Sequence, residues 1–509
     1  MRIRPPALKG LEPHAGVLSA LFGGLCLGLA APDFGWWPLT WVAVVPFLIY
    51  LERSERPPAF WLGTLLGMIY YLMLLYWLLG FHPLTWLGIA WWPSLAIAVG
   101  AWLFVSVSQA WLVGLWASLL VRSRLGGWQR IVFGTGLWVA LHWLWGQGDT
   151  AFPWGNLAQS QVPDVWVLQI VSLGGSQLLV GGLVAFNLLL AAAFTRPKRF
   201  GPAALALLVT THLYGLVQLA RPPVPAGSLR IGVIQGNIAQ ARKWTAQGRR
   251  QAIDTYVRGY EKLAAQGAQL VLTPESAFAF VWPRLTSASL PLVAEIRARR
   301  VPVLLSAFDR RPDGQLSTAI FALGSEAQVL SFYNKIHLVP LGEQIPFKGL
   351  IGPLVRKLSP IQAEVYPGTL DQRLLTPYGP IAGGICFDSA FSEGFRAQVA
   401  NGARLLVQAT NDAWYGPAMA PEHHAFDALR ATETGRYLVR ASNNGTSALI
   451  DSHGRTVRIT GWNTYADFIE AVPLLVGYTP YVRWGEWFVP VAAAGALAGL
   501  LLGRTAPKK

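Results

Sequence analysis

Long runs of apolar residues fill the first 220 positions of the chain and return once near its C-terminus. A transmembrane helix needs roughly 20 predominantly apolar residues to cross the hydrocarbon core of a bilayer. The pattern therefore predicts a seven-span membrane domain over residues 1–220 and an eighth span at 487–503. The seven predicted spans are centred on 17–30, 37–50, 60–79, 87–121, 131–145, 167–194 and 203–219.

The basic residues beside these runs fall into alternate loops. They are Arg2, Arg4 and Lys9; Arg53 and Arg56; Arg122, Arg124 and Arg130; Arg196, Lys198 and Arg199; and Arg504, Lys508 and Lys509. The intervening segments 31–36, 81–86 and 147–165 contain no Lys or Arg. Because short cytoplasmic loops carry the excess of basic residues, both termini are expected in the cytoplasm, including a basic tail at 504–509. Seven spans then place the segment 221–483 outside it.

The composition agrees with a membrane protein, since 53% of the residues are hydrophobic and only 13% are charged. A net charge of +15 would indicate a nucleic-acid partner in a soluble protein. Here the basic loops have a simpler explanation, because they meet anionic headgroups of the cytoplasmic leaflet. No nucleic-acid motif accompanies them, so we expect no nucleic acid as a partner.

The middle of the chain has a different pattern. A Pro-rich linker at 221–228 cannot continue a helix. After it, short β-rich runs at 229–235, 269–273, 301–306, 319–323, 381–385 and 405–408 alternate with helix-like stretches at 246–266 and 289–299. This alternation predicts an exported α/β domain over residues 229–480.

The chain has only two cysteines, and they are too far apart to pair. Cys26 lies inside the first predicted span, where a small packing role explains it. Cys386 follows the predicted strand 381–385 at a point where a helix could start, and a helix N-terminus lowers the pKa of a thiol. A nucleophilic thiolate also needs a base and a group that stabilises the oxyanion. Two other predicted strand ends supply Glu275 and Lys335.

Three motifs of the chain resemble those that carry the Glu-Lys-Cys triad of the nitrilase superfamily. They are Leu272-Thr273-Pro274-Glu275-Ser276, Tyr333-Asn334-Lys335-Ile336-His337-Leu338 and Ile381-Ala382-Gly383-Gly384-Ile385-Cys386. The resemblance covers roughly residues 229–474 and implies an α-β-β-α sandwich. With the predicted spans, the whole chain resembles the bacterial apolipoprotein N-acyltransferase family. Further matches are Gln235-Gly236-Asn237-Ile238, Lys243-Trp244, Leu338-Val339-Pro340-Leu341-Gly342-Glu343, Asn411-Asp412-Ala413-Trp414 and Ser442-Asn443-Asn444-Gly445.

The resemblance implies a membrane enzyme that needs no cofactor or metal. Glu275 would be the base, Cys386 the nucleophile and Lys335 an oxyanion partner, with Glu343 in a supporting role. A phospholipid, with phosphatidylethanolamine expected, would donate an acyl chain through a Cys386 thioester to the N-terminal amine of a diacylated apolipoprotein. The protein would lie in the bacterial inner membrane, with the catalytic domain in the periplasm.

Some alternatives remain open at this point. A membrane-anchored nitrilase-type amidase would keep the triad but hydrolyse a small amide. A transporter is disfavoured because residues 57–121 contain no Asp, Glu, Lys or Arg. Glu343 could instead be a loop carboxylate that pairs with Lys335 or Arg356. The apolar loops 277–282 and 345–351 could form either buried core or a lid that enters the membrane. Phe387-Asp388 stands where the family commonly has Tyr-Glu, which leaves the role of Asp388 undefined.

Overall fold

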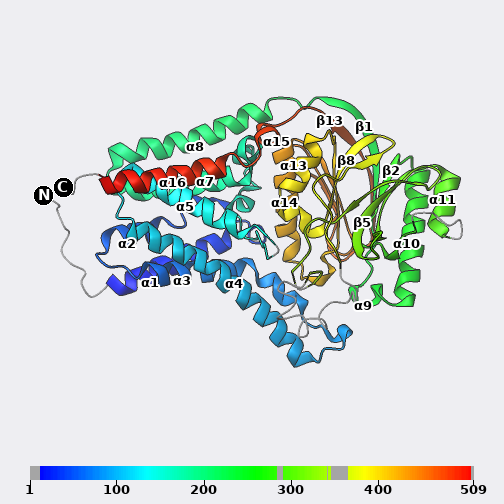
Figure 1. Ribbon diagram of the computed structural model, residues 1–509, viewed down its shortest axis with the longest axis horizontal. Coiled ribbons are helices and arrows are strands. Elements are labelled where there is room, and N and C mark those ends of the chain that lie inside the picture. The colour runs from blue at the N-terminus through cyan, green and yellow to red at the C-terminus, as the bar shows by residue number, and fades with distance from the viewer. Residues whose placement is uncertain (1–11, 149, 284–289, 341, 345–364, 506–509) are drawn as a thin grey trace.

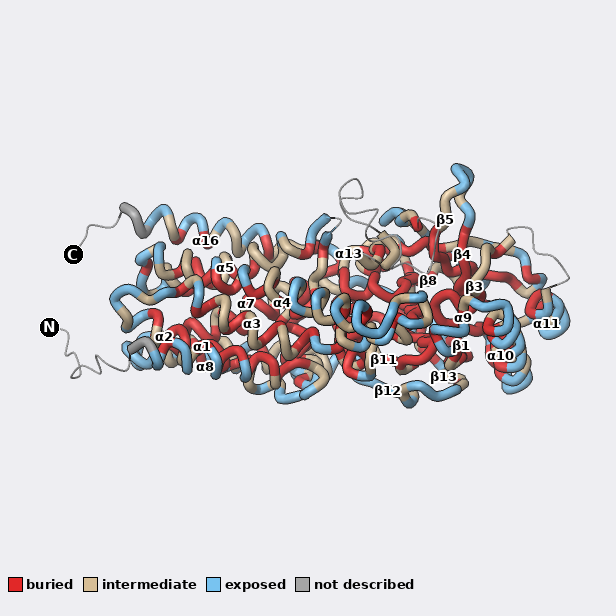
Figure 2. Tube along the Cα trace, turned by 90° about the horizontal axis from the view of Figure 1, so that it is seen from below, coloured by how far each residue is buried: buried red, intermediate tan, exposed pale blue. Residues whose placement is uncertain are grey.

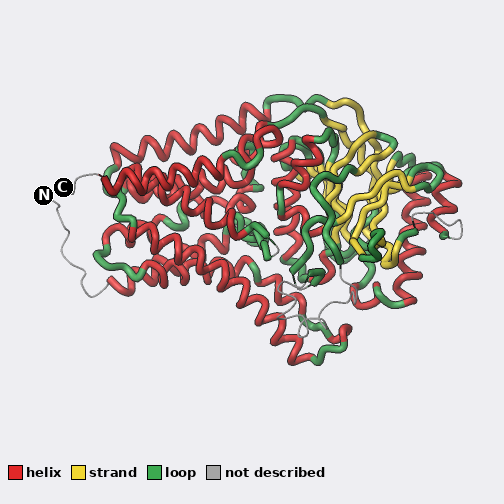
Figure 3. Tube along the Cα trace, viewed as in Figure 1, coloured by secondary structure: helices red, strands yellow, loops and turns green. Residues whose placement is uncertain are grey.

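The computed structural model describes residues 12–148, 150–283, 290–340, 342–344 and 365–505. A bundle of helices and a domain rich in strands lie end to end along the molecule (Figure 3). Both regions have a buried interior, and the exposed residues lie mostly on the outer helices and the loops (Figure 2).

The helical bundle contains apolar helices, and most of the longer ones run along the long axis of the molecule, whereas α4 runs obliquely to them (Figure 1). They are α1 (Glu12–Leu29), α2 (Val45–Arg53), α3 (Ala59–Leu74), α4 (Trp91–Arg122), α5 (Gly127–Trp145), α6 (Val165–Leu168), α7 (Val171–Ala193), α8 (Pro197–Leu219) and α16 (Phe488–Thr505). Three of these described helices, α4, α7 and α8, are long and apolar enough to cross a membrane. Shorter apolar helices cover His14–Leu29, Ala59–Leu74 and Phe488–Leu502. The helical bundle therefore contains three candidate membrane spans among the described residues, and the prediction of eight spans is not confirmed.

The second predicted span, 37–50, differs most from the structure. It consists of a short 3-10 helix, η1 (Trp37–Trp41), and the nine-residue helix α2, each with a proline in its first turn. Proline lacks a backbone N–H and clashes with the carbonyl four residues earlier, so it starts helices and breaks their interiors. A count of apolar residues does not register this effect.

The strand-rich domain contains two sheets. The first has the order β13–β1–β2–β4–β5–β6, with β3 paired to β4, and the second has the order β12–β11–β10–β9–β8–β7. The strands of the first sheet are β1 (Pro225–Gln235), β2 (Leu270–Leu272), β3 (Phe278–Val281), β4 (Val303–Arg310), β5 (Leu316–Leu323), β6 (Val329–Asn334) and β13 (Ala466–Leu475). Those of the second are β7 (Leu374–Thr376), β8 (Gly379–Ile385), β9 (Leu406–Thr410), β10 (Leu438–Ser442), β11 (Ala448–Ile450) and β12 (Thr456–Ile459). The six predicted strand runs all lie on observed strands, and β1 begins inside the predicted linker.

Alternating side chains of these strands explain how the layers form. On β4, Leu304 faces the core between the two sheets, whereas Val303 and Leu305 face the helices that cover the first sheet. This period of two is the geometry of a strand buried on both faces. The covering helices are α10 (Ala246–Ala265) and α11 (Pro291–Arg299) on the first sheet, and α13 (Glu393–Ala400) and α14 (Met419–Thr434) on the second. The result is the α-β-β-α order of layers, which confirms the predicted sandwich.

Helix α14 lies between the second sheet and the helical bundle (Figure 1). Its Glu433 is buried and accepts a hydrogen bond at 2.9 Å from the backbone N–H of Ser176 in α7. Helix α7 is kinked at Gly174 and Gly175, and the φ of Gly175 is +73°. Because the kink frees backbone N–H groups of the following turn, the Glu433 carboxylate acts as a cap from the other domain. The two domains are thus joined through a buried contact.

Candidate active site

The three sequence-predicted catalytic residues each follow the end of a strand. Glu275 follows β2, Lys335 comes directly after β6, and Cys386 comes directly after β8. All three side chains are buried. The structure therefore brings residues from both sheets together at one end of the sandwich, although they lie far apart in the sequence.

Lys335 is held between two carboxylates. Its Nζ lies 3.0 Å from Oε1 of Glu275 and 2.9 Å from the carboxylate of Glu343. Burial alone would lower the pKa of Lys335, but the charges of Glu275 and Glu343 outweigh burial and keep its pKa well above the ordinary value. The ammonium group is thus a fixed positive charge. Glu343 pairs with Lys335, as both interpretations of that residue allowed, whereas Arg356 lies outside the described residues.

The backbone at Cys386 has an unusual conformation. The φ angle of Cys386 is +48°, in the left-handed region that residues other than Gly rarely adopt. Cys386 is also the first residue of the 3-10 helix η6 (Cys386–Ala390). Such a conformation costs about 1–3 kcal/mol and persists only where the surroundings impose it. Burial, followed by the negative charge of Glu275, raises the pKa of the Cys386 thiol, while the positive charge of Lys335 opposes the rise. The resting thiol therefore keeps its proton, contrary to the lowered pKa expected from a helix start.

Asp388 holds the turn that carries Cys386. Its Oδ2 accepts from the backbone N–H of Ile385 at 3.0 Å, and its Oδ1 accepts from the backbone N–H of His337 at 2.7 Å. The carboxylate is buried. Since His337 lies two residues after Lys335, the Asp388 side chain connects the loop that carries Lys335 with the turn that carries Cys386. Asp388, which stands where the family commonly has Glu, thus holds the two backbone segments together.

The contact between His337 and Asp388 depends on pH. The Nδ1 of His337 lies 3.3 Å from Asp388 and its Nε2 lies 2.9 Å from Glu393. Burial alone would lower the pKa of His337, but the two carboxylates raise it from 6.5 to about 9. Because the pKa of His337 is higher in the folded than in the unfolded protein, protonated His337 stabilises the fold. This stabilisation is complete below the unfolded pKa and is lost as the pH rises through the folded pKa. It amounts to at most about 3 kcal/mol.

We expect the thermal midpoint of the full-length protein to fall as the pH is raised from roughly 6.5 to 9. A His337→Gln variant should be less stable at the lower pH and should lose most of that slope. Differential scanning fluorimetry of both proteins across this range measures the effect. Parallel curves for wild type and variant would contradict the assignment to His337.

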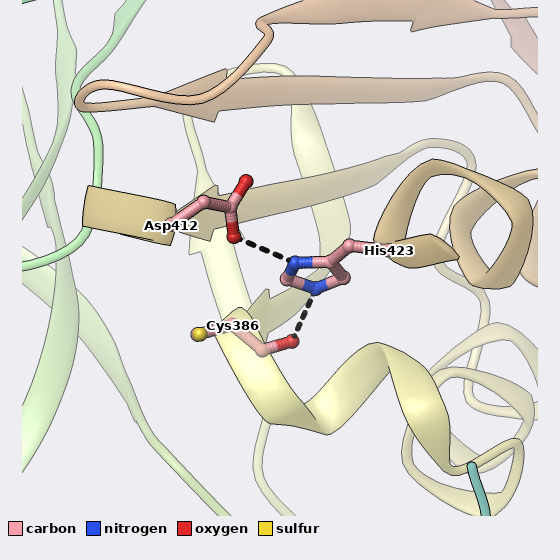
Figure 4. A group of neighbouring side chains, drawn as sticks. All are labelled: Cys386, Asp412 and His423. Atoms are coloured by element: carbon pink, nitrogen blue, oxygen red, sulfur yellow. Dashed lines mark hydrogen bonds and ion pairs between the residues drawn. The ribbon is translucent and has the colours of Figure 1, made fainter. Parts of the chain in front are cut away.

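A buried polar network lies beside Cys386 (Figure 4). His423 of α14 donates from Nε2 to the carbonyl oxygen of Cys386 at 3.0 Å, and its Nδ1 lies 2.8 Å from Oδ1 of Asp412. The Sγ of Cys386 points away from the imidazole ring (Figure 4). Burial would raise the pKa of Asp412, but the charges of Arg440 and His423 hold it well below its usual range. This network fixes the carbonyl group of the strained residue.

Cys386, Asp412 and His423 also form a group whose ligand atoms lie within 4.8 Å of one another, as in a metal site. Their atoms are already engaged, however. The Nε2 of His423 donates its proton to a carbonyl and has no lone pair to offer, and the carboxylate of Asp412 is paired with Arg440. The arrangement fits a positioning role better than a metal centre.

Two residues near the site were given no role from the sequence. Lys243, which belongs to the Lys243-Trp244 match, is buried and donates from Nζ to the backbone carbonyl of Glu275 at 2.9 Å. Burial lowers its pKa to about 8, although the charges of Glu275 and Cys386 oppose this shift. His423 had no motif around it. Its only signal was the spacing of His423, Asp427, Arg430 and Thr434, which places polar side chains on one face of a helix.

The apolar loop 277–282 forms β3 and a section of the core. Ala277, Phe278 and Trp282 are each at most 2% exposed, so the buried-core interpretation holds for these residues. The second apolar loop, 345–351, lies outside the described residues.

Aromatic side chains of the helical bundle pack on the site. Trp154 stacks on Phe387, the residue after Cys386, with ring centroids 6.2 Å apart. Trp77 contacts Tyr415 edge to face at 4.9 Å. Phe387 is buried and Tyr415 is half-buried. The helical bundle therefore forms one side of the candidate active site.

Two family models match the chain. Residues 23–189 match the apolipoprotein N-acyltransferase N-terminal domain, and residues 230–472 match carbon-nitrogen hydrolase. The second match covers the α-β-β-α sandwich. The sandwich is thus a domain of the nitrilase-type enzyme class.

Curated relatives extend the match to the whole chain. An apolipoprotein N-acyltransferase from Gloeobacter violaceus is 68% identical over 494 residues, which cover 96% of this chain and 94% of the relative. One from Nostoc sp. is 38% identical over 487 residues, covering 93% and 96%. The chain belongs to the apolipoprotein N-acyltransferase family. A solved nitrilase-superfamily structure from Saccharomyces cerevisiae aligns with a TM-score of 0.39 and 14% identity over 53% of this chain and 98% of its own.

Proposed function

We propose that this protein transfers an acyl chain from a membrane phospholipid, through a thioester on Cys386, to the N-terminal α-amine of a diacylglyceryl cysteine on apolipoproteins. The observation that carries the proposal is the position of the nucleophile. The charges of Glu275 and Lys335, which belong to the buried Glu275–Lys335–Glu343 cluster, act on the Cys386 thiol. The turn of Cys386 is packed against aromatic residues of the helical bundle. A nitrilase-type site that adjoins a membrane domain is suited to an acyl donor held in the bilayer.

In the first step, Glu275 takes the proton of the Cys386 thiol, which the raised pKa keeps in place until then. The thiolate attacks the ester carbonyl of the phospholipid, and the positive charge of Lys335 stabilises the oxyanion. The carbon–oxygen bond breaks and the lysophospholipid leaves with the proton. A thioester remains on Cys386.

In the second step, the neutral α-amine of the diacylated cysteine attacks the thioester. A carbon–nitrogen bond forms, the carbon–sulfur bond breaks, and Glu275 accepts the proton of the amine and returns one to the thiol. Phosphatidylethanolamine is the donor we propose. The reaction is of the ping-pong type, in which the lysophospholipid departs before the acceptor reacts.

We further propose the orientation that the basic loops indicate, in the bacterial inner membrane with both termini in the cytoplasm. The domains would be the membrane domain at 1–220, the linker at 221–228, the periplasmic catalytic domain at 229–480, the last span at 487–503 and the tail at 504–509. Eight crossings remain a proposal, with η1 and α2 together forming the second. A fluorescent protein that matures only in the cytoplasm, fused to the C-terminus, should fluoresce; a dark but stable fusion would overturn the orientation.

Intact mass spectrometry of the full-length protein tests the proposed reaction. After incubation with a phospholipid of defined chain, wild type should gain the mass of one acyl group, and neutral hydroxylamine should remove it. Cys386→Ser should show no hydroxylamine-sensitive adduct. Addition of a diacylated cysteinyl peptide should then discharge the enzyme and give an acylated peptide.

The alternative, a membrane-anchored amidase, predicts another result in the same experiment. Phospholipid would leave the enzyme unmodified, whereas a small amide would be hydrolysed with the same dependence on Cys386. That outcome would replace the acyl-transfer proposal.

A further inference from the structure

A cavity of about 460 Å³ lies among the helices of the membrane domain, well away from Cys386. It is formed by the end of α2, the loop between α4 and α5, the first turn of α5, the end of α7 and the start of α8. These ends lie at the end of the bundle farthest from the sandwich (Figure 1). The cavity therefore has no direct role in the proposed acyl transfer.

The charge of the cavity lining is strongly positive. Among the described residues, Arg124, Arg130, Arg196 and Arg199 line it, and Glu52 is the single acidic one. Arg199 lies over the ring of Phe200, and the charge of Glu52 acts on Arg130. Four positive charges around one negative charge still repel one another, and an anion between them would relieve that repulsion.

Arg130 shows the need for a partner most clearly. Its Nη1 reaches only the backbone carbonyl of Leu120, at 3.5 Å, and its Nη2 is buried without a hydrogen-bond partner among the described residues. A buried, unpaired donor on a charged group is costly, so an acceptor at this position would stabilise the protein. A guanidinium group matches the geometry of phosphate oxygens well.

Two helix N-termini meet at the same cavity. Helix α5 begins at Gly127 after the N-cap Gly126, and α8 begins at Pro197 after the N-cap Arg196; neither N-cap side chain makes a capping hydrogen bond. Gly126, Gly127 and Arg196 all line the cavity. Helix N-termini carry partial positive charge and free N–H groups, which favour anions.

The rest of the lining contains the polar Gln129 and Thr195 together with apolar walls formed by Leu48, Ile131, Leu188 and Phe200. Free phosphate would gain nothing from such walls, whereas the glycerol and upper acyl carbons of a lipid would be covered by them. We propose that this cavity binds the phosphate group of an anionic phospholipid, such as phosphatidylglycerol, in the leaflet opposite the catalytic domain.

Binding can be measured on the full-length, delipidated protein in mixed micelles, by native mass spectrometry and by the shift in thermal midpoint. Phosphatidylglycerol should bind wild type at least about tenfold more tightly than phosphatidylcholine of the same chains. Inorganic phosphate at the same concentration should have little effect. Arg130→Gln and Arg199→Gln should each weaken phosphatidylglycerol binding about fivefold.

Two matched variants serve as controls. Arg122→Gln removes an arginine at the end of α4 that does not line the cavity, and it should bind like wild type. Glu52→Gln removes the one acidic residue of the lining and should bind phosphatidylglycerol more tightly, which keeps the test valid if the arginine variants fold poorly.

Equal binding of phosphatidylglycerol and phosphatidylcholine would overturn the proposal, as would wild-type binding in both arginine variants and in Glu52→Gln. If inorganic phosphate stabilised the protein as much as phosphatidylglycerol, the cavity would be a site for a free anion and the lipid assignment would be wrong.

Discussion

A Lys335→Met variant is expected to form the acyl-enzyme about 10²–10³ times more slowly than wild type and to lose about 3–5 kcal/mol of stability. The rate falls because the oxyanion loses its positive partner. The stability falls because Glu275 and Glu343, which both contact Nζ of Lys335, become two buried carboxylates without a counter-charge. Single-turnover acylation followed by intact mass, together with the thermal midpoint, measures both effects.

Lys262→Met is the matched control for stability. Lys262 also pairs with a carboxylate, Asp467, but its side chain is 54% exposed, so its removal should cost less than about 1 kcal/mol. Lowering the pH should reduce the defect of Lys335→Met, because protonation neutralises the two stranded carboxylates. An equal loss of stability in both variants would show that the buried cluster has no special electrostatic role.

Glu275→Gln should slow acylation by about 10²–10⁴-fold while the protein stays folded. The amide keeps the size of the side chain and one acceptor oxygen for Lys335, but it cannot take a proton from Cys386. The raised pKa of the thiol makes this loss severe, because little thiolate exists without a base. The acylation rate at several pH values measures the effect, and the rate of the variant should recover as the pH rises.

Glu343→Gln is the control for this variant, since it too removes one of the two charges beside Lys335. Glu343 accepts from the backbone N–H of Val339 at 2.9 Å, which suits a residue that holds its loop in place. Its acylation rate should fall less than that of Glu275→Gln. If the two variants were slowed equally, the proton would not be assigned to Glu275 alone.

The sequence predicts the sandwich well because its signals are local. Each predicted strand is a short apolar run, and Glu275 and Cys386 come just after two of these runs. Lys335 follows β6, which is not among the six predicted runs and is only partly buried. The spans are predicted less well. Apolar composition at 37–50 is sufficient for a span, but the prolines at the starts of η1 and α2 divide it.

Local sequence patterns do not reveal contacts between segments that are far apart in the chain. The spacing of His423 on α14 indicates a polar helix face, yet only the fold reveals that both sides of α14 are covered and that His423 reaches the carbonyl of Cys386. Asp388 is similar. From the sequence it is a departure from the family pattern, whereas in the structure its two oxygens join the backbone of Ile385 to that of His337.

The aromatic contacts between Trp154 and Phe387, and between Trp77 and Tyr415, bear on how the enzyme can be studied. A soluble fragment cut at the Pro-rich linker would lose both tryptophans. Phe387 and Tyr415 would then face water, and the strained turn at Cys386 would lose one of the surfaces that hold it. Such a fragment is expected to fold as a sandwich that is prone to aggregate and poor in activity, which makes the intact membrane protein the smallest useful unit for biochemistry.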